Sequence, residues 1–337
     1  MKQKYLSFYS LCNTKIYYPY GISGSKKTIL STDISSLWDL KISRRDVISV
    51  DKITDLIPKS RRDGILNLLN LFYQIRIFLL FILFFSSTQT FAQRIAILGA
   101  MPEEIQLLES EMSHIKAKSI LGFQFKTGKL NGKKIVLTET GIGKVNAAVV
   151  TTLIIKEFHP KSVIFTGIAG GISEALKQGD IVIGNKLTYH DYGRLTNEGL
   201  STNATRNPIT KQLNPLYFSS DSLLVLQALS AAKEVTLQKM PAAASQPNIS
   251  VGTIVTGDTF VTSSTAVGNF EKTLQASATE MEGAAVAQVC FQQNIPFLII
   301  RSISDKANEK ASVDFQTFKK IASDNSATLV KEILKKL

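Results

Sequence analysis

The sequence contains few of the residues that build metal sites and disulfide frameworks. Its 337 residues include two cysteines, Cys12 and Cys290, and three histidines. This count excludes a disulfide framework or a four-ligand zinc site. The histidines have no clustered ligands beside them, so we expect no metal site. Cys290 lies in an apolar run and is predicted to be a small buried hydrophobe.

The sequence also has no dense stripe of Lys and Arg after Arg94, although its formal net charge is +12. Residues 1–93 carry 13 Lys and Arg against 6 Asp and Glu, a net +7, and the remaining 244 residues carry 26 against 21, a net +5. The basic excess therefore belongs mostly to the N-terminal part. Without a basic stripe and interleaved aromatic residues, we expect no nucleic-acid partner.

The apolar run Ile77–Phe85 is only nine residues long, whereas a helix needs about 20 residues to span a bilayer. It is preceded by Arg76 and followed by a polar stretch with a small residue, Ala92, before Gln93. This layout is typical of a secretory signal peptide. We therefore expect three segments: an irregular one over 1–64, a signal peptide or signal anchor over 65–93, and a folded domain over 94–337.

The position of the apolar run leaves two interpretations open. A signal peptide starts near the first residue of a protein, and no methionine occurs between Met1 and Met101. In the first interpretation, translation begins at a non-Met codon near Leu69–Ile75, residues 1–64 are not translated, and the exported protein is cleaved after Ala92. In the second, the run is an uncleaved anchor behind a genuine N-terminal segment. Either way we expect an exported protein, periplasmic or membrane-anchored, with membrane contact only through this segment.

After residue 93, short apolar runs that end at Gly or at an acid alternate with stretches of helical spacing. Hydrophobic residues make up 44% of the chain, which is enough for a packed core. The alternation predicts an α/β domain. Strands are predicted within 94–100, 134–143, 161–172, 179–193, 251–261 and 296–308, and Gly-rich turns are predicted to end two of these stretches, at 141–143 and 167–171. Helices are predicted within 101–112, 144–158, 221–235, 278–294 and 315–337, and the stretch 278–294 is predicted to begin with a turn.

Ligands of α/β folds bind at the carboxyl ends of the strands. Five stretches are predicted to converge there: Gly99–Glu104, Gly141–Gly143, Gly167–Gly171, Asp258–Phe260 and Arg301–Asp305. Residues 192–250 are rich in Asn, Thr and Pro, and we expect a loop-rich insertion near the mouth of this site.

Several known motifs are incomplete in this sequence. The stretch around Lys144 lacks the spacing and the hydroxyl residue of a P-loop, and GIAGGI lacks the full dinucleotide-binding fingerprint. His190 has no nucleophile elbow of the Gly-x-Ser-x-Gly type to act with. His114 and His159 are predicted to lie at helix ends.

Carboxylates are the remaining candidates for chemistry. Glu103 and Glu104 follow the first predicted strand, Asp305 follows the last, and Glu282 begins a helix. Each alone has a structural explanation, either a favourable charge at a helix N-terminus or, for Asp305, a helix N-cap. Together they gather carboxylates at the strand ends of one sheet, which favours acid–base chemistry on a polar ligand.

A set of motifs from Arg94 to Leu337 resembles, in order and approximate spacing, the methylthioadenosine/S-adenosylhomocysteine nucleosidases of the nucleoside phosphorylase superfamily. The motifs are ILGAMPEE, TGIGKVNAA, TGIAGGI, GDIVI, YHD, TGDTFV, TEMEGAAVAQVC and RSISD. The resemblance implies a single domain with a central twisted mixed sheet flanked by helices, and a homodimer. It also implies hydrolysis of the N-glycosidic bond of adenine nucleosides, without metal or cofactor, in methionine salvage.

The resemblance implies chemical roles for three of the acids. Asp305 corresponds to the residue that protonates the leaving adenine, and burial can keep it partly protonated near neutral pH. Glu104 corresponds to the residue that holds and activates the attacking water. Glu282 corresponds to the carboxylate that binds both ribose hydroxyls, and carboxylates also stabilise a cation-like sugar.

Further substrate contacts are implied in the same way: Met281 on the sugar, Phe260 stacked on the base, the backbone of Val261 on the edge of the base, Arg301 supporting this wall, and Ala100 and Ile168 lining the pocket. Ile168 stands where better-known nucleosidases have a small hydroxyl residue, so its side chain cannot hydrogen-bond the water. Glu280 has no role in the family pattern. An ion pair with Arg301 on the adjacent strand would satisfy both charges.

Two alternatives to hydrolysis are weighed. Phosphorylases of the superfamily bind phosphate through an Arg in the loop after the first strand, whereas Glu103 and Glu104 occupy that loop here and repel phosphate. A non-catalytic periplasmic nucleoside-binding protein would need only Phe260 and Glu282. The presence of both Asp305 and Glu104 favours an enzyme.

Overall fold

The computed structural model describes residues 70–78, 94–197, 199–241 and 245–337. The chain divides into two compact units, Met1–Thr88 and Gln89–Leu337. In the first unit the described residues, 70–78, form a helix. Most of the predicted apolar run and the cleavage site after Ala92 lie outside the described residues. Among the residues that are described, no helix is long and apolar enough to cross a membrane.

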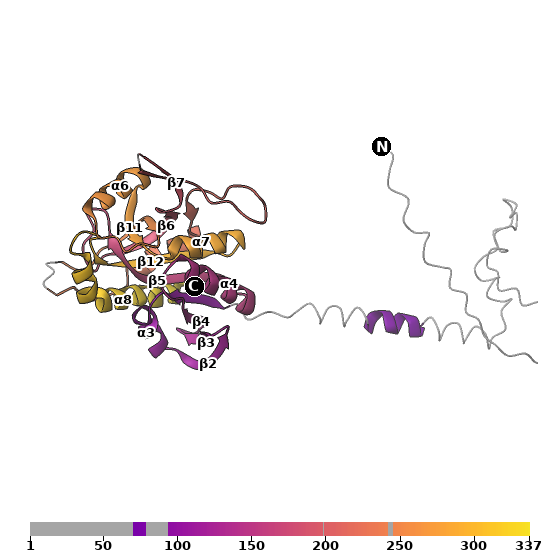
Figure 1. Cartoon of the computed structure of the whole chain (residues 1–337). Helices are drawn as coiled ribbons and strands as arrows, with labels where there is room; N and C mark the ends of the chain where they lie inside the picture. The colour runs from indigo at the N-terminus through magenta and orange to yellow at the C-terminus, as the bar shows by residue number, and fades with distance from the viewer. Residues whose placement is uncertain (1–69, 79–93, 198, 242–244) are drawn as a thin grey trace, which may run out of the picture. The chain divides into compact units, whose positions relative to one another are not determined.

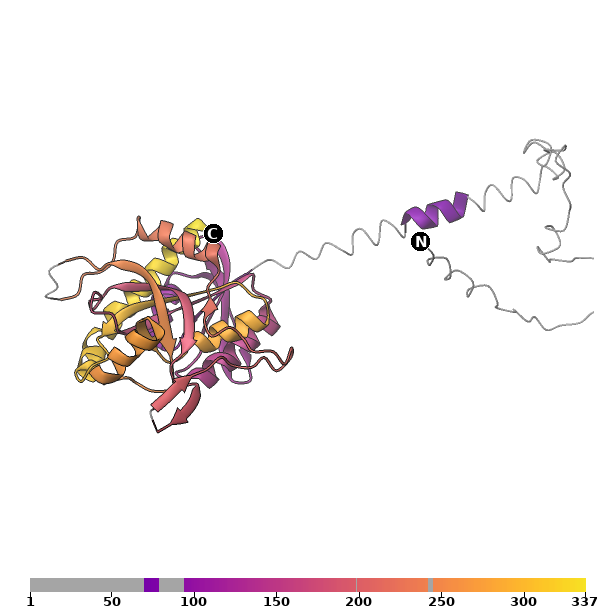
Figure 2. The same cartoon turned by 90° about the horizontal axis from the view of Figure 1, so that it is seen from above.

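The strands of the second unit have these bounds: β1 Ile95–Gly99, β2 Ser113–Ile120, β3 Phe123–Leu130, β4 Lys133–Glu139, β5 Ser162–Gly171, β6 Ile181–Tyr189, β7 Gly193–Thr196, β8 Gly199–Thr202, β9 Phe218–Ser219, β10 Ile249–Thr256, β11 Ala276–Glu280 and β12 Phe297–Asp305. In the described part of the chain, ten of them form one sheet in the order β11-β10-β6-β12-β5-β1-β4-β3-β2, with β9 paired to β6 (Figure 1). The sheet mixes parallel and antiparallel neighbours, as expected. The remaining pair, β7 and β8, forms an exposed hairpin that projects from the domain in Figure 2.

Helices cover the two faces of the sheet (Figure 1). Their bounds are α3 Pro102–Ser110, α4 Lys144–Phe158, α5 Ser222–Ala232, α6 Ser264–Leu274, α7 Gly283–Gln292 and α8 Ala311–Lys336. Successive side chains of a strand point to opposite faces. In β1, Ile95 and Ile97 therefore pack in the cluster that contains residues of α3, α5 and α8, whereas Ala96 and Leu98 pack in the cluster with α4 and α7. The predicted α/β fold with a mixed central sheet is confirmed.

The C-terminal end of β5 joins two parts of the sheet. β5 lies parallel to β1 and β12, and its last residues, Gly170 and Gly171, pair with Thr279 and Ala278 of β11 in the antiparallel sense. Pairing therefore runs from β5 through β12, β6, β10 and β11 back to β5. This closure brings strand ends that are far apart in the sequence to one place.

Some local predictions were wrong. Residues 167–171 were expected to form a turn but are buried in β5, because Gly167, Gly170 and Gly171 admit close neighbours. The segment before Glu282 was expected to be a turn, but 276–280 form β11, whose pairing with β10 and β5 leaves no local sequence signal. His114 lies in β2 and not at a helix end, and β2 is mostly exposed, so no apolar alternation marks it.

Three other structural interpretations can now be compared with the fold. Asp305 is the last residue of β12, and the N-cap of α8 is Lys310, so Asp305 is not a helix cap. Cys290 is buried as predicted. His159 ends α4, as expected for a residue at a helix end.

Candidate active site

The ends of β1, β5, β11 and β12 border a pocket that, with its open mouth, encloses about 500 Å³. Its lining includes seven of the nine predicted site residues: Ala100, Glu104, Ile168, Phe260, Met281, Glu282 and Asp305. Val261 lines a smaller adjoining pocket that shares Phe260 and Asp305 with the first. Arg301 does not line either pocket and is only 1% exposed. The structure thus brings the predicted residues together, with Arg301 behind the wall.

Glu104 is held by backbone groups from two elements. The start of α3 turns the side chain back, so that one carboxylate oxygen accepts from the N–H of Ala100 at 2.6 Å and of Met101 at 3.1 Å. The other oxygen accepts from the N–H of Ile168 in β5 at 3.0 Å. Burial raises the pKa of Glu104, while the positive charge of Arg301 and the three backbone donors act in the opposite direction. Ile168 thus supports Glu104 through its backbone.

Gly167 makes this arrangement possible. A Cβ atom at this position would lie 2.5 Å from Oε1 of Glu104 and 3.0 Å from Nη1 of Arg301. Contacts this short are incompatible with a side chain, so only glycine lets the carboxylate and the guanidinium approach the backbone of β5 this closely.

Asp305 is a buried carboxyl group at the end of β12, only 2% exposed. Its Oδ1 accepts from the N–H of Ala307 at 2.8 Å, and its Oδ2 accepts from the hydroxyl of Ser304 at 2.8 Å. Burial raises the pKa of Asp305, and the two hydrogen bonds oppose that rise. A carboxyl group in this environment can hold a proton and release it to a ligand in the pocket.

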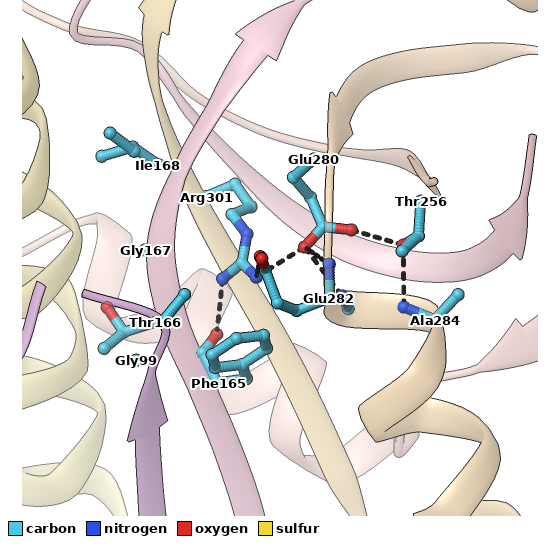
Figure 3. A network of polar contacts seen from close by, with 12 residues as sticks. Gly99, Phe165, Thr166, Gly167, Ile168, Thr256, Glu280, Glu282, Ala284 and Arg301 are labelled. Atoms are coloured by element: carbon cyan, nitrogen blue, oxygen red, sulfur yellow. Dashed lines mark hydrogen bonds and ion pairs between the residues drawn. The ribbon is translucent and has the colours of Figure 1, made fainter. Parts of the chain in front are cut away.

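Arg301 is enclosed by acids and an aromatic ring (Figure 3). Its Nη2 lies 2.7 Å from Oε2 of Glu280 and 3.9 Å from Oε2 of Glu282, and its guanidinium lies over the ring of Phe165 at 4.2 Å. The predicted pair between Glu280 and Arg301 is therefore confirmed. Their strands are not neighbours, however, because β11 pairs with β10 and β5, whereas β12 pairs with β5 and β6.

Glu280 has a structural role at the start of α7. Besides Arg301, its carboxylate accepts from the hydroxyl of Thr256 and from the N–H groups of Glu282 at 3.1 Å and Gly283 at 2.7 Å. The Thr256 oxygen in turn accepts from the N–H of Ala284 (Figure 3). Glu280 thereby satisfies the first backbone donors of α7, which otherwise have no partner within the helix.

Glu282, the N-cap residue of α7, has far fewer donors than Glu280. Its Oε1 accepts from the N–H of Gly143 at 2.8 Å, at the turn before α4. Burial, and then the negative charge of Glu280, raise the pKa of Glu282 to about 8. Its remaining acceptor capacity faces the pocket, where it can bind polar groups of a ligand.

The apolar walls of the pocket come partly from residues that sequence reasoning missed. Phe260, which is 46% exposed, meets Phe315 of α8 edge-on at 5.5 Å between ring centroids. The sequence predicts a helix over 315–337 but gives Phe315 no place in the site. Met101, Ile142, Thr279 and Ser304 also line the pocket and were not identified. All four lie within the quoted family motifs, but none was assigned a role of its own, because their place in the pocket depends on how the strand ends meet.

A charged network joins three loops beside the pocket. The ammonium group of Lys144 lies 2.6 Å from Asp191 and 3.6 Å from Asp258. The N–H of Lys144 donates to Asp258, and the N–H of Asp258 donates to Asp191, each at 2.8 Å. Lys144 therefore links the turn that holds Glu282 to the loop that carries Phe260, and does not form part of a phosphate loop.

His190 lies outside this chemistry. It is 5% exposed and packs on the ring of Phe270 at 4.5 Å, and burial lowers its pKa. In the part of the chain that the structure describes, no three His, Cys, Asp or Glu residues are grouped as a metal site requires.

The fold and the carboxylate-lined pocket define a class of protein. The family model described as "Phosphorylase superfamily" matches residues 94–335, so the chain is a member of that superfamily. Among its relatives, the 5′-methylthioadenosine/S-adenosylhomocysteine nucleosidase of Psychromonas ingrahamii is 40% identical over 248 residues, 72% of this chain and 99% of the relative. That of Staphylococcus haemolyticus is 38% identical over 244 residues, 72% of this chain and 100% of the relative.

Solved structures of nucleosidases and of a related hydrolase are also similar to this chain. The nucleosidase of Neisseria meningitidis, in complex with methylthio-immucillin-A, is 43% identical, with a TM-score of 0.64 over 73% of this chain and 100% of that one. The futalosine hydrolase of Helicobacter pylori is 31% identical, with a TM-score of 0.63 over 73% of this chain and 99% of that one. Within the superfamily, this chain belongs to the 5′-methylthioadenosine/S-adenosylhomocysteine nucleosidase family.

Proposed function

We propose that this protein hydrolyses the N-glycosidic bond of 5′-substituted adenine nucleosides such as 5′-methylthioadenosine and S-adenosylhomocysteine, releasing adenine and the 5′-substituted ribose. One observation carries the proposal: a single pocket combines the buried carboxyl groups of Asp305, Glu104 and Glu282, each with a different set of donors. The names of the relatives support the same reaction.

Asp305 acts at the base. Its carboxyl proton is transferred to N7 of adenine, the C1′–N9 bond breaks, and the bonding electrons stay on the base, which leaves as neutral adenine. The raised pKa of Asp305 favours the protonated acid that this transfer needs. Phe260 stacks on the ring, and the backbone of Val261 binds its edge.

Glu104 and Glu282 act at the sugar. The ribose becomes cation-like as the base leaves, and the oxygens of the two carboxyl groups, which carry partial or full negative charge, stabilise it. Glu104 orients a water molecule and accepts its proton while the oxygen bonds to C1′. Glu282 binds the 2′ and 3′ hydroxyls, with Met281 packed on the sugar. Glu282 accepts a single backbone donor, which leaves its oxygens available for both hydroxyls.

The 5′ group is proposed to lie against apolar side chains. Met101, Ile142, Ile168 and Phe315 line the same pocket and suit an alkylthio substituent. Because a futalosine hydrolase is also similar to this chain, futalosine belongs in the substrate panel.

Phosphorolysis is disfavoured by charge. None of the described residues that line the pocket is Lys, Arg or His, and Arg301 behind it is already paired with Glu280. We expect purified protein to release adenine from 5′-methylthioadenosine in phosphate-free buffer, measured by chromatography. Activity that appears only after phosphate is added would overturn the proposal of hydrolysis.

We also propose that the protein is a homodimer. The exposed apolar residues Ile142, Val145 and Val149, which are 51%, 73% and 40% exposed, lie at the mouth of the pocket and along the first turns of α4. Light scattering coupled to size-exclusion chromatography should give twice the mass of one chain. V145E should shift the protein to a monomer, whereas a wild-type mass of one chain would refute this proposal.

Export is a proposal from the sequence alone. Cleavage after Ala92 predicts a mature chain that begins at Gln93, whereas an anchor predicts retention of residues 65–93. N-terminal sequencing of the exported protein distinguishes the two. A full-length protein found only in the cytosolic fraction would contradict both, and with them a place for methionine salvage outside the cytoplasm.

A further inference from the structure

Thr279 in β11 carries a buried hydroxyl group. The residue is 5% exposed, and its Oγ1 has no hydrogen-bond partner among the described residues. The nearest polar side chains in this part of the sheet differ in this respect, since Glu280, the next residue, and Thr256, its partner in β10, are both hydrogen-bonded. A buried hydroxyl without a partner destabilises a protein, so such a group calls for an explanation.

The position of Thr279 points to a ligand. Thr279 lines both the main pocket and the smaller adjoining one, whose other members include Val261 and Asp305. It is also only two residues before Met281, which the proposed function places on the sugar. The side chain therefore lies where base and sugar meet. With no protein acceptor to hold the hydroxyl, rotation about χ1 can turn it toward a ligand.

The chemistry of the base limits the possible partners. Under the proposed function, N7 of adenine takes the proton of Asp305, the backbone of Val261 binds the edge that carries N1 and the amino group, and N9 is bonded to the sugar. N3 is the remaining ring nitrogen with a free lone pair, and it lies next to the glycosidic bond. A hydroxyl donor at the junction of base and sugar matches that acceptor.

We propose that the Thr279 hydroxyl donates a hydrogen bond to N3 of the bound adenine and so selects for bases with a nitrogen at that position. This inference rests on the proposed function, since it takes the orientation of the base from it. In the free protein the unpaired hydroxyl of Thr279 lowers stability, and it gains a hydrogen-bond partner only when the base is bound.

The test compares adenine with 3-deazaadenine, which lacks N3, and with 1-deazaadenine as control. Binding to wild-type protein, T279V and T279S is measured by calorimetry. We expect T279V to bind adenine and 1-deazaadenine about tenfold more weakly than wild type and 3-deazaadenine equally well, with T279S within about twofold of wild type. Val matches Thr in shape and removes the orphan hydroxyl, so free T279V should melt at the same or a higher temperature than wild type.

Each other outcome overturns the inference. An equal loss of affinity for all three bases, or a lower melting temperature of T279V, would show that the hydroxyl acts within the protein. No loss for adenine would show that the hydroxyl does not contact it, and a loss absent only for 1-deazaadenine would place the contact at N1. Wild-type protein that binds no adenine would overturn the proposed function itself, and this inference with it.

Discussion

The strongest electrostatic prediction concerns Glu282. This residue is 5% exposed, and burial together with the charge of Glu280 raises its pKa to about 8 from the ordinary value of 4.5. In the unfolded chain the same carboxyl group is solvated and titrates near 4.5. Between these two pH values the folded protein therefore binds a proton that the unfolded chain has lost.

Proton linkage determines whether Glu282 makes the folded protein more or less stable as the pH rises. The contribution of Glu282 to stability is fully present below about pH 4.5 and is lost as the pH rises toward the folded pKa of about 8. The loss is about 1.36 kcal/mol for each pH unit, or roughly 5 kcal/mol over the whole interval. E282Q removes this titration and keeps an oxygen that can accept from the N–H of Gly143. We expect E282Q and wild type to be similar at pH 5, and E282Q to be more stable by several kcal/mol at pH 8.

The assay is urea unfolding followed by circular dichroism at pH 5, 6, 7 and 8 and constant ionic strength. Glu104 and Asp305 titrate in both proteins, so the difference between the two free energies of unfolding isolates Glu282. E234Q is the matched control, because the Glu234 side chain is 55% exposed and pairs only with Lys336 at the surface. A stability difference between E282Q and wild type that does not change with pH would refute the reasoning.

Four further variants test the rest of the site. D305N should lower adenine release at least about a hundredfold while the fold is retained, and wild-type activity should fall as the pH rises through the raised pKa of Asp305; an unaffected rate would exclude Asp305 as the acid. G167A places a Cβ atom 2.5 Å from Oε1 of Glu104, so chromatographic assays should show lost activity with an unchanged dichroism spectrum. R301M leaves Glu280 buried without its cation and should cost about 3–5 kcal/mol in urea unfolding; a near-zero change would contradict a stabilising role for the pair. K144M should raise KM more than it lowers kcat, because Lys144 links the loops around the pocket without lining it; a change confined to kcat would contradict that role.

Strands and helices with strong local patterns could be predicted from the sequence. β1, α4 and β12 are long buried runs or helical repeats, and each occurs where its pattern predicts it. β2 and β11 could not be predicted in this way. β2 is largely exposed and lacks alternation, and β11 is a short stretch of small and polar residues whose stability comes from its two neighbouring strands.

The residues of the candidate site also fall into two groups, those that sequence patterns identified and those that they did not. The acids at strand ends and the family motifs identified Asp305, Glu104 and Glu282, and the structure places all three in one pocket. Phe315 and Thr279 could not be found, since Phe315 has an ordinary helical pattern and Thr279 lies in the strand that local patterns missed. The chemical roles of these residues remain predictions for the variants above.

By itself the sequence determined the class of fold, the family and the residue types of the site, because hydrophobic periodicity and short motifs are local properties of the chain. It also indicated different roles for the two neighbouring acids, with Glu282 at the ribose and Glu280 in an ion pair with Arg301. The tertiary structure alone decided that Glu280 is enclosed by Arg301, Thr256 and the start of α7, whereas Glu282 has one backbone donor and faces the pocket. The two carboxyl groups differ because closure of the sheet between β5 and β11 surrounds one with donors and leaves the other at the pocket wall, and that closure depends on contacts more than 100 residues apart in the chain.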